Sequence, residues 1–305
     1  MLTSSLTPAH FSRSVMAVPP LARGANRSLD VEANGRIIRH LEGGGVSLLL
    51  YGGNANFYHL PLPEYDATLT MLARLAGKDT LVVPSAGPTY GLLLEHARVV
   101  RRQSFPAVMV LPQQGITTSL GVANAIREFV GAAGVPAIVY VKNDGYIEPE
   151  EIAALDKEGL VAAVKYAVVR KDPSDYTYLR KLVSLVDKSK VISGIGEQPA
   201  IVHVRDFGLG GFTSGCVCIA PRLSQAMLAA VRRQDWTEAE RIRAIFAPLE
   251  DLRNAINPIR VLHQAVESAG IAPTGPLLPL LTNVEAAHVP AIEVAARALL
   301  DANGR

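Results

Sequence analysis

Several residue patterns are scarce in this sequence, and each shortage excludes a class of protein. The 305 residues include two cysteines, Cys216 and Cys218, too few for a disulfide scaffold or a four-cysteine zinc site. Nothing approaches the ~18 consecutive apolar residues of a membrane-spanning helix. The apolar stretch at residues 15–22 is broken by Pro19 and Pro20 and follows a polar leader, so it makes a poor signal peptide. We therefore expect a cytoplasmic protein without a membrane partner.

An excess of one charge is missing as well. Lys and Arg total 30 and Asp and Glu total 28, a net charge of +2, so we expect no basic field that would attract nucleic acid. Charged residues make up 19% and aromatic residues 6%, whereas 49% are hydrophobic. This balance rules out a disordered chain and predicts a sizeable core. The abundance of Val, Ile, Leu and Ala is typical of strands buried on both faces.

Short apolar runs alternate with longer amphipathic runs through most of the chain. Strands are predicted at residues 14–18, 46–51, 80–83, 107–111, 136–140, 160–166, 190–193 and 211–214. Helices are predicted between them, for example at residues 29–42, 64–75, 91–102, 119–132, 149–158 and 176–186. Eight such repeats favour an α/β fold of the (β/α)8 TIM barrel type. No G-x-G-x-x-G follows the first strand, which removes the main reason to prefer a dinucleotide-binding fold.

Beyond Pro221 the pattern is helical only. Helices are predicted at residues 224–232, 237–254, 259–269 and 283–301. No polar, hinge-like linker separates them from the preceding repeats. We therefore expect a barrel at residues 1–223 and, at residues 224–305, a C-terminal helical extension packed on it.

One lysine lies where barrel enzymes place their chemistry, at the carboxyl end of a strand. Lys165 follows five apolar residues of the sixth predicted strand, and strand alternation puts it on one face with Val161 and Ala163. Among such neighbours an ammonium is desolvated, which lowers its pKa and favours the nucleophilic free amine. A free amine of this kind forms Schiff bases with keto groups. The alternative is a strand-end lysine that reaches out to solvent.

Two further elements lie at neighbouring strand ends. Tyr140 ends the fifth predicted strand, 25 residues and one repeat before Lys165, where its phenol could move protons beside the amine. The second strand is followed by a turn that contains Gly53 and Asn54, whose backbone N–H groups could hold a carboxylate. The alternatives are a core tyrosine and an ordinary glycine turn before a helix.

These elements, in this order, resemble the dihydrodipicolinate synthase and N-acetylneuraminate lyase family of class I barrel lyases. The segment from Gly52 to Leu60, followed by Glu64, looks like the family's G-T-T-G-E-x-x-x-L…E motif. Tyr140 matches its proton-handling tyrosine and Lys165 its Schiff-base lysine. The remaining matches are Ser193-Gly194 after the seventh strand, the G-x-x-G-x-I-S-x-x-x-N-x-x-P-like segment carried by Gly208, Gly211, Thr213, Ser214, Cys218 and Pro221, and Asn257-Pro258-Ile259 in the tail.

The resemblance implies a site and an assembly. Lys165 and Tyr140 would be catalytic, and Gly53, Asn54, Gly194 and Thr213 would bind a small 2-oxo acid. No cofactor and no metal are implied. The chain would assemble as a homotetramer, a dimer of dimers, or as a homodimer.

The sequence also departs from the family pattern. Gly53 and Asn54 stand where the family has two threonines, so the hydroxyl between tyrosine and lysine is missing. Gln113-Gln114 replaces the tyrosine that would reach into a neighbouring subunit's site, which leaves Gln114 as at most a substrate-binding contact. No arginine follows Tyr140 at the place where the synthases bind a dicarboxylic substrate. These differences imply a different substrate.

We therefore expect a Schiff-base-forming lyase, either an aldolase or a dehydratase, that acts on pyruvate or a sugar-derived 2-keto acid. One alternative is a catalytically degenerate barrel that binds a 2-oxo acid as a sensor. Another is a metal-dependent barrel lyase, although the seven histidines show no i, i+4 spacing.

A few other residues carry weaker signals. Cys216 and Cys218 are expected on one face of the eighth strand as buried structural residues. Tyr58 and His59 are candidates to line a pocket. Glu197 is a candidate acid or hydroxyl anchor.

Overall fold

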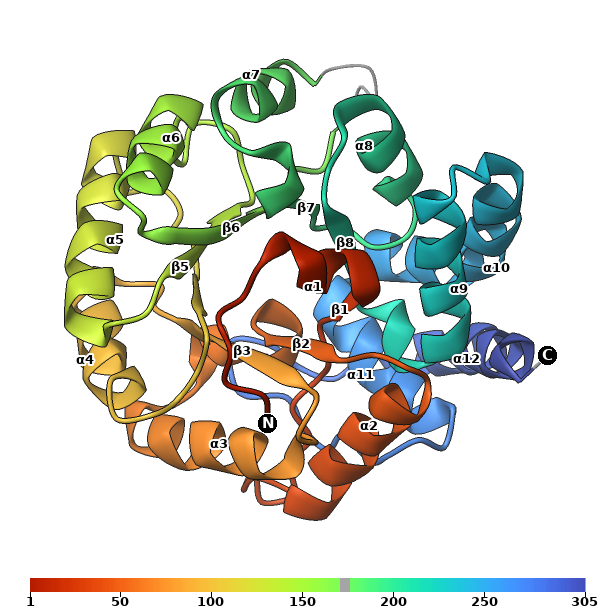
Figure 1. The fold of residues 1–305 in the computed structure, drawn as a ribbon. Helices are drawn as coiled ribbons and strands as arrows, with labels where there is room; N and C mark the ends of the chain where they lie inside the picture. The colour runs from red at the N-terminus through yellow and green to blue at the C-terminus, as the bar shows by residue number, and fades with distance from the viewer. Residues whose placement is uncertain (171–175, 305) are drawn as a thin grey trace.

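The computed structural model is a closed barrel of eight parallel strands, which confirms the predicted fold class (Figure 1). The structure describes residues 1–170 and 176–304. Each strand pairs with its sequence neighbour, and β1 pairs with β8 to close the sheet. The strands are β1 (Met16–Ala17), β2 (Leu48–Tyr51), β3 (Leu81–Ala86), β4 (Val108–Val110), β5 (Ala137–Val141), β6 (Val161–Tyr166), β7 (Val191–Ser193) and β8 (Gly211–Ser214).

Each of the eight predicted strand segments overlaps one strand, although β3 runs three residues beyond its predicted end, to Ala86, and β5 runs one residue beyond, to Val141. Every strand residue is buried except Tyr140, which is half-buried. Burial on both faces explains why the segments are continuously apolar rather than alternating, since one face fills the barrel and the other packs under the helices.

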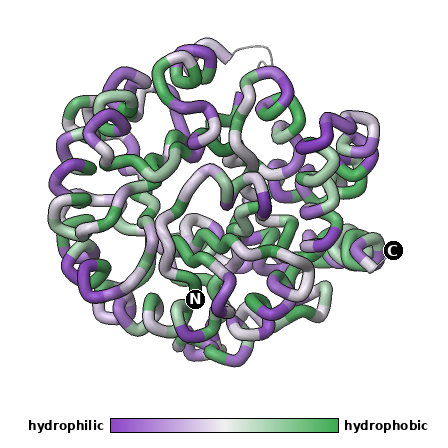
Figure 2. The backbone as a smooth tube through the Cα atoms, in the orientation of Figure 1, coloured by the Kyte–Doolittle hydropathy of each residue, from purple (hydrophilic) through white to green (hydrophobic). Residues whose placement is uncertain are grey.

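A ring of helices surrounds the sheet (Figure 1). These are α2 (Val31–Gly43), α3 (Leu62–Leu75), α4 (Tyr90–Val100), α5 (Ser119–Ala133), α6 (Pro149–Lys157), α7 (Thr177–Leu185), α8 (Ala200–Phe207) and α9 (Pro221–Arg232). In Figure 2 the hydrophilic stretches lie mostly on this outer ring. A short first helix, α1 (Pro8–Arg13), lies across the amino-terminal mouth of the barrel, where Phe11 packs against Gly211 at the start of β8.

Three helices follow the barrel: α10 (Trp236–Ala255), α11 (Pro258–Ser268) and α12 (Val289–Asn303). The helices α10 and α12 pack on α9 at the edge of the barrel, whereas α11 packs on α10, on α12 and on the turn after β2 (Figure 1). The helix predicted from residue 283 begins only at Val289, because residues 286–288 form a separate 3-10 turn. The domain boundary predicted after residue 223 falls inside α9, and the division itself stays a prediction. Within the described ranges, no helix is long and apolar enough to cross a membrane.

The cysteine prediction is wrong in its local structure. Cys216 and Cys218 lie in a 3-10 turn after β8, not on the strand, so strand alternation does not orient their thiols. The chain leaves the sheet at Ser214, whose hydroxyl accepts a hydrogen bond from the backbone N–H of Val217 at 2.9 Å. Both thiols are fully buried and free.

Candidate active site

A cavity of about 170 Å³ opens at the carboxyl ends of the strands. Six of the seven predicted site residues line it together: Gly53, Asn54, Tyr140, Lys165, Gly194 and Thr213. Gln114 does not line the cavity of its own chain, because it lies exposed on the loop after β4. Of the two neighbours weighed from the sequence, Tyr58 lines the cavity and His59 does not.

Lys165 and Tyr140 are direct neighbours across β5 and β6. The two residues are paired in the register of these strands, and Lys165 Nζ lies 4.5 Å from the centroid of the Tyr140 ring. The lysine side chain points into the barrel with the residue only 6% exposed. Burial, together with the positive charges of Lys142 and Arg253, lowers the pKa of Lys165 to about 7. A large fraction of the amine is therefore neutral at pH 7.

The Tyr140 phenol lies beside this amine and differs from it in how it holds its proton. Burial raises the pKa of Tyr140 to about 12, because the phenolate would lose its hydration. The hydroxyl therefore keeps its proton at neutral pH while lying beside an amine that can lose one. Such a pair can hand a proton to an oxygen atom that forms on a bound carbonyl.

Gly194 makes room for the lysine. A Cβ at this position would lie 2.6 Å from Ala167 Cβ, 2.8 Å from the Tyr166 carbonyl oxygen and 3.0 Å from Lys165 Cγ. The Gly194 N–H donates to that same Tyr166 carbonyl at 2.6 Å. Any side chain at residue 194 would therefore displace either the turn after β7 or the Lys165 stem.

The turn after β2 presents backbone donors to the cavity. Gly53–Ala55 forms a 3-10 turn, and the first N–H groups of such a turn have no acceptor inside it. The turn is held from both sides, because Asn54 Nδ2 donates to the Val18 carbonyl at 2.9 Å and His263 Nε2 lies 2.8 Å from the Asn54 carbonyl. The turn is thus fixed in place, and Gly53 and Asn54 line the same cavity as Lys165.

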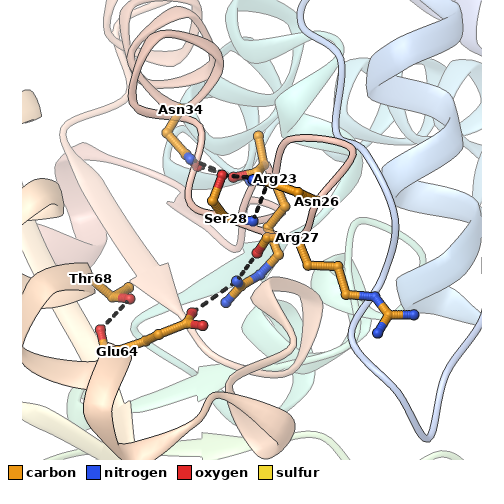
Figure 3. A network of polar contacts seen from close by, with 8 residues as sticks. Arg23, Asn26, Arg27, Ser28, Asn34, Glu64 and Thr68 are labelled. Atoms are coloured by element: carbon orange, nitrogen blue, oxygen red, sulfur yellow. Dashed lines mark hydrogen bonds and ion pairs between the residues drawn. The ribbon is translucent and has the colours of Figure 1, made fainter.

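A polar network holds the loops behind this turn (Figure 3). Arg23, on the loop after β1, donates to the Arg27 carbonyl and, at 2.9 Å, to Glu64 Oε2 on α3. Asn34 on α2 accepts from the Ala22 N–H at 3.0 Å. Glu64, one of the residues that matched the family motif, therefore joins α3 to the first loop and does not face the cavity.

The extension contributes to the cavity wall, which sequence reasoning missed. Arg253 and Asn254 of α10 line the cavity together with Pro258 and Ile259 of α11. A signal was present: Glu250 and Arg253 fall in the same helical stripe as the buried apolar residues of α10, and they are its charged members. A charge in an apolar stripe indicates a buried polar contact.

Glu197 lies behind the cavity rather than in it. The residue is fully buried and accepts hydrogen bonds from Ser214 Oγ at 2.8 Å and Ser224 Oγ at 2.7 Å. Its backbone N–H donates to Glu250 Oε1 at 2.9 Å, and the two carboxyl groups are hydrogen-bonded to each other. Burial raises the pKa of Glu197, and burial together with the Glu197 charge raises the pKa of Glu250, so each carboxyl group of the pair binds a proton more readily than an exposed glutamate does. Glu197, which the sequence offered as an acid or hydroxyl anchor, thus binds the hydroxyl groups of two serines of the protein itself.

Side chains that could bind a metal ion do not cluster in the part of the chain that the structure describes. Across residues 1–170 and 176–304, no cluster of three or more His, Cys, Asp or Glu side chains could hold a metal ion. His263 is the histidine that contacts the site, through the Asn54 carbonyl, and burial lowers its pKa to about 4. It therefore stays neutral near pH 7.

Comparison with known proteins finds relatives of low sequence identity that align with most of the chain. No family model matches the sequence. The chain is 22% identical over 246 residues to the Streptomyces coelicolor protein named "Probable 5-dehydro-4-deoxyglucarate dehydratase 1". The aligned region covers 77% of this chain and 76% of that relative. It is 25% identical over 288 residues to the 4-hydroxy-tetrahydrodipicolinate synthase of Exiguobacterium sibiricum, covering 92% and 94% of the two chains.

A solved structure agrees with these sequence relatives at the level of the fold. The crystal structure of dihydrodipicolinate synthase from Bacillus clausii superposes with a TM-score of 0.82 at 23% identity, covering 98% of this chain and 99% of that chain. The sequence relatives are named as dehydratases and synthases, and they match along most of their own length. The chain is thus similar, along most of its length, to members of the dihydrodipicolinate synthase family, from which it diverges widely in sequence.

Proposed function

We propose that the protein is a Schiff-base-forming lyase that acts on a 2-oxo acid through Lys165. The observation that carries this proposal is a buried lysine at the end of β6, with its pKa lowered to about 7, in contact with the Tyr140 ring inside a small cavity. A neutral amine is the nucleophile that carbonyl addition requires. A cavity of about 170 Å³ suits a small metabolite rather than a polymer.

Residues of the cavity account for substrate binding and imine formation in the proposed reaction. The substrate carboxylate accepts hydrogen bonds from the N–H groups of Gly53 and Asn54, which aims the keto carbon at Lys165 Nζ. The amine adds to the carbonyl, Tyr140 gives a proton to the departing oxygen, and water leaves to form the imine. The protonated imine withdraws electrons and makes the adjacent carbon acidic, so that a C–C or a C–O bond can break.

The relatives support both outcomes, since one is named as a dehydratase and another as a synthase. We propose pyruvate or a sugar-derived 2-keto acid as the substrate. The missing threonine hydroxyls at Gly53 and Asn54 favour a substrate different from that of the synthases.

Reduction with borohydride in the presence of pyruvate tests the proposal. An imine on Lys165 is reduced to a stable secondary amine, which intact mass and peptide mapping detect. We expect one adduct per chain in the wild type and none in Lys165→Ala, whose far-ultraviolet circular dichroism should stay unchanged because a strand-end side chain contributes little to core packing. Trapping that persists in Lys165→Ala would assign the chemistry to another lysine. Stabilisation by pyruvate without any adduct would instead support a sensor.

A further inference from the structure

Arg253 is a buried cation in the cavity wall that the chemistry proposed above does not use. It comes from α10, outside the barrel sheet, and the residue is 8% exposed. Its guanidinium lies against the backbone of Gly215 just after β8, where a Cβ would come within 2.6 Å of Nη2. The lack of a side chain at residue 215 therefore lets Arg253 reach the cavity.

The guanidinium keeps donors that the protein does not satisfy. Nε donates to the Pro258 carbonyl at 3.2 Å, and Nη1 contacts the Cys216 sulfur, a weak acceptor, at 3.7 Å. Within residues 1–170 and 176–304, nothing accepts a hydrogen bond from Nη2, and no carboxylate forms an ion pair with Arg253. Nη2 is nevertheless not sealed inside the protein, so it is accessible from the cavity that Arg253 lines. The geometry therefore favours a ligand that supplies an acceptor from the cavity side.

The carboxyl groups that interact electrostatically with Arg253 are those of Glu250 and Glu197, and neither residue lines the cavity. Glu250 lies one turn earlier on α10 and is hydrogen-bonded to Glu197, and this acid pair ties the helix to the loop after β7. The described lining of the cavity includes the cations Lys142, Lys165 and Arg253 but no Asp or Glu. The acid pair thus positions Arg253 without filling its open donors.

We propose that Arg253 binds a second carboxylate of the substrate, at the end distant from the keto group, so that the cavity selects 2-oxo dicarboxylic acids. This inference rests on the proposed function, because it takes the first carboxylate to lie at the turn after β2 and the keto carbon at Lys165. A guanidinium edge matches a carboxylate in geometry and charge. Lys142 is exposed, and a solvated ammonium contributes less to binding.

The experiment pairs each dicarboxylic acid with a monocarboxylic acid of the same chain length. Wild-type protein is titrated with 2-oxoglutarate against 2-oxopentanoate, and with 2-oxoadipate against 2-oxohexanoate. The readout is the concentration that gives half-maximal borohydride trapping on Lys165. We expect at least one diacid to half-saturate at a concentration about tenfold or more below that of its partner, as for a charge-assisted hydrogen bond.

Three variants assign this preference to a residue. Arg253→Met should bring the paired acids to within about twofold of each other, because the thioether chain keeps the packing but removes the charge. Arg253→Lys should keep part of the preference, since it keeps the charge and loses the planar edge. Arg297→Met removes an exposed arginine of α12 and should keep the preference in full. Unfolding midpoints with the same acids, measured without borohydride, report binding independently of the adduct.

The outcomes separate the two proposals. The inference is overturned if wild-type protein does not distinguish the paired acids, if the preference survives in Arg253→Met, or if Lys142→Met removes it instead. Failure of the proposed function looks different, because no acid, pyruvate included, would then give an adduct. In that case the unfolding midpoints still decide whether diacids bind through Arg253. If Arg253→Met does not fold, the wild type and Arg253→Lys supply the comparison.

Discussion

The lowered pKa of Lys165 is caused by its surroundings rather than by a neighbouring base. Its ammonium form is disfavoured by burial and, to a lesser extent, by the positive charges of Lys142 and Arg253. The Tyr140 phenol beside it is itself held protonated by burial. The site therefore joins an amine that readily loses a proton to a hydroxyl that keeps one, and neither residue needs a metal or a carboxylate partner to be in that state.

The first prediction concerns the pH dependence of imine formation. Removing the charge of Lys142 by Lys142→Met stabilises the ammonium form of Lys165 and so raises its pKa. The midpoint of the pH profile for cyanoborohydride trapping with pyruvate should lie near pH 7 in the wild type and move up by roughly 0.2 to 0.7 pH unit in the variant. Lys157→Met, on α6 at the opposite end of the barrel, should leave the midpoint in place. A downward shift in Lys142→Met would contradict the assigned cause.

The second prediction concerns Tyr140. Tyr140→Phe removes one hydroxyl and keeps the ring, so packing beside Lys165 should be nearly unchanged. Turnover of the true substrate should fall about 10²- to 10⁴-fold, the usual contribution of a positioned proton donor. The thermal unfolding midpoint controls for damage to the fold. Unchanged turnover would reduce Tyr140 to a residue that only packs against the lysine.

At the scale of the elements, the third prediction concerns the turn after β7, where Gly194 packs closely against β6. Gly194→Ala places a methyl group within 3.0 Å of Lys165 Cγ and closer still to the backbone of β6. Trapping should therefore fall by at least about tenfold, because small displacements of reacting atoms are costly. Gly91→Ala on α4 is the matched control, since a Cβ there meets nothing within 4 Å. Equal trapping in the two variants would show that the turn can adjust freely.

The acid pair that joins α10 to the loop after β7 gives the fourth prediction. In the folded protein the pKa of Glu250 is raised above its ordinary value of 4.5 by burial and by Glu197, so the native state binds a proton that the unfolded chain releases. Its contribution to stability is therefore complete below about pH 4.5 and is lost as the pH rises through the raised pKa.

Glu250→Gln keeps the shape and removes this titration. The loss of unfolding free energy between pH 5 and pH 8, measured by urea denaturation, should be smaller in Glu250→Gln than in the wild type. Glu293→Gln, which changes an exposed carboxyl of α12, should follow the wild-type profile. A steeper loss in Glu250→Gln would place the bound proton elsewhere.

At the scale of the whole molecule, the fifth prediction concerns assembly. Tyr90, Ile116 and Leu120 expose apolar surface around a groove between α4 and α5, next to the loop that carries Gln114. Apolar surface gathered in this way marks an interface, and the family resemblance implies a dimer or tetramer. Sedimentation should therefore give an oligomer, which Ile116→Asp should dissociate. A wild-type monomer at working concentration would refute this assembly.

The same loop offers a chemical test of the oligomer. An amide cannot relay protons near neutral pH, but it can bind a substrate hydroxyl or a water. If Gln114 reaches a neighbour's cavity, Gln114→Ala should raise KM more than it lowers kcat. The reverse pattern would show that the loop takes part in the reaction.

Much of the fold follows from the sequence because it depends on local periodicity. The eight apolar runs mark the eight strands, and a barrel places their carboxyl ends together, so Lys165, Tyr140 and Gly53 could be predicted as neighbours. The 3-10 turn at Cys216 was not predictable in this way, since a short apolar run reads equally well as the end of a strand. Arg253 was missed because its position depends on how a helix outside the barrel packs against it.

The wall built by α10 and α11 has a consequence for how the protein is made. A ribosome that has synthesised the chain as far as α9 has completed the sheet, the reactive amine and the turn after β2, yet not Arg253 or the histidine that holds the Asn54 carbonyl. Until residues of the final quarter of the chain emerge, the nascent barrel has an open cavity and its turn after β2 is held from one side only, by the bond from Asn54 to the Val18 carbonyl. A truncated product with an intact sheet would therefore carry Lys165 in a cavity that lacks the wall contributed by α10 and α11.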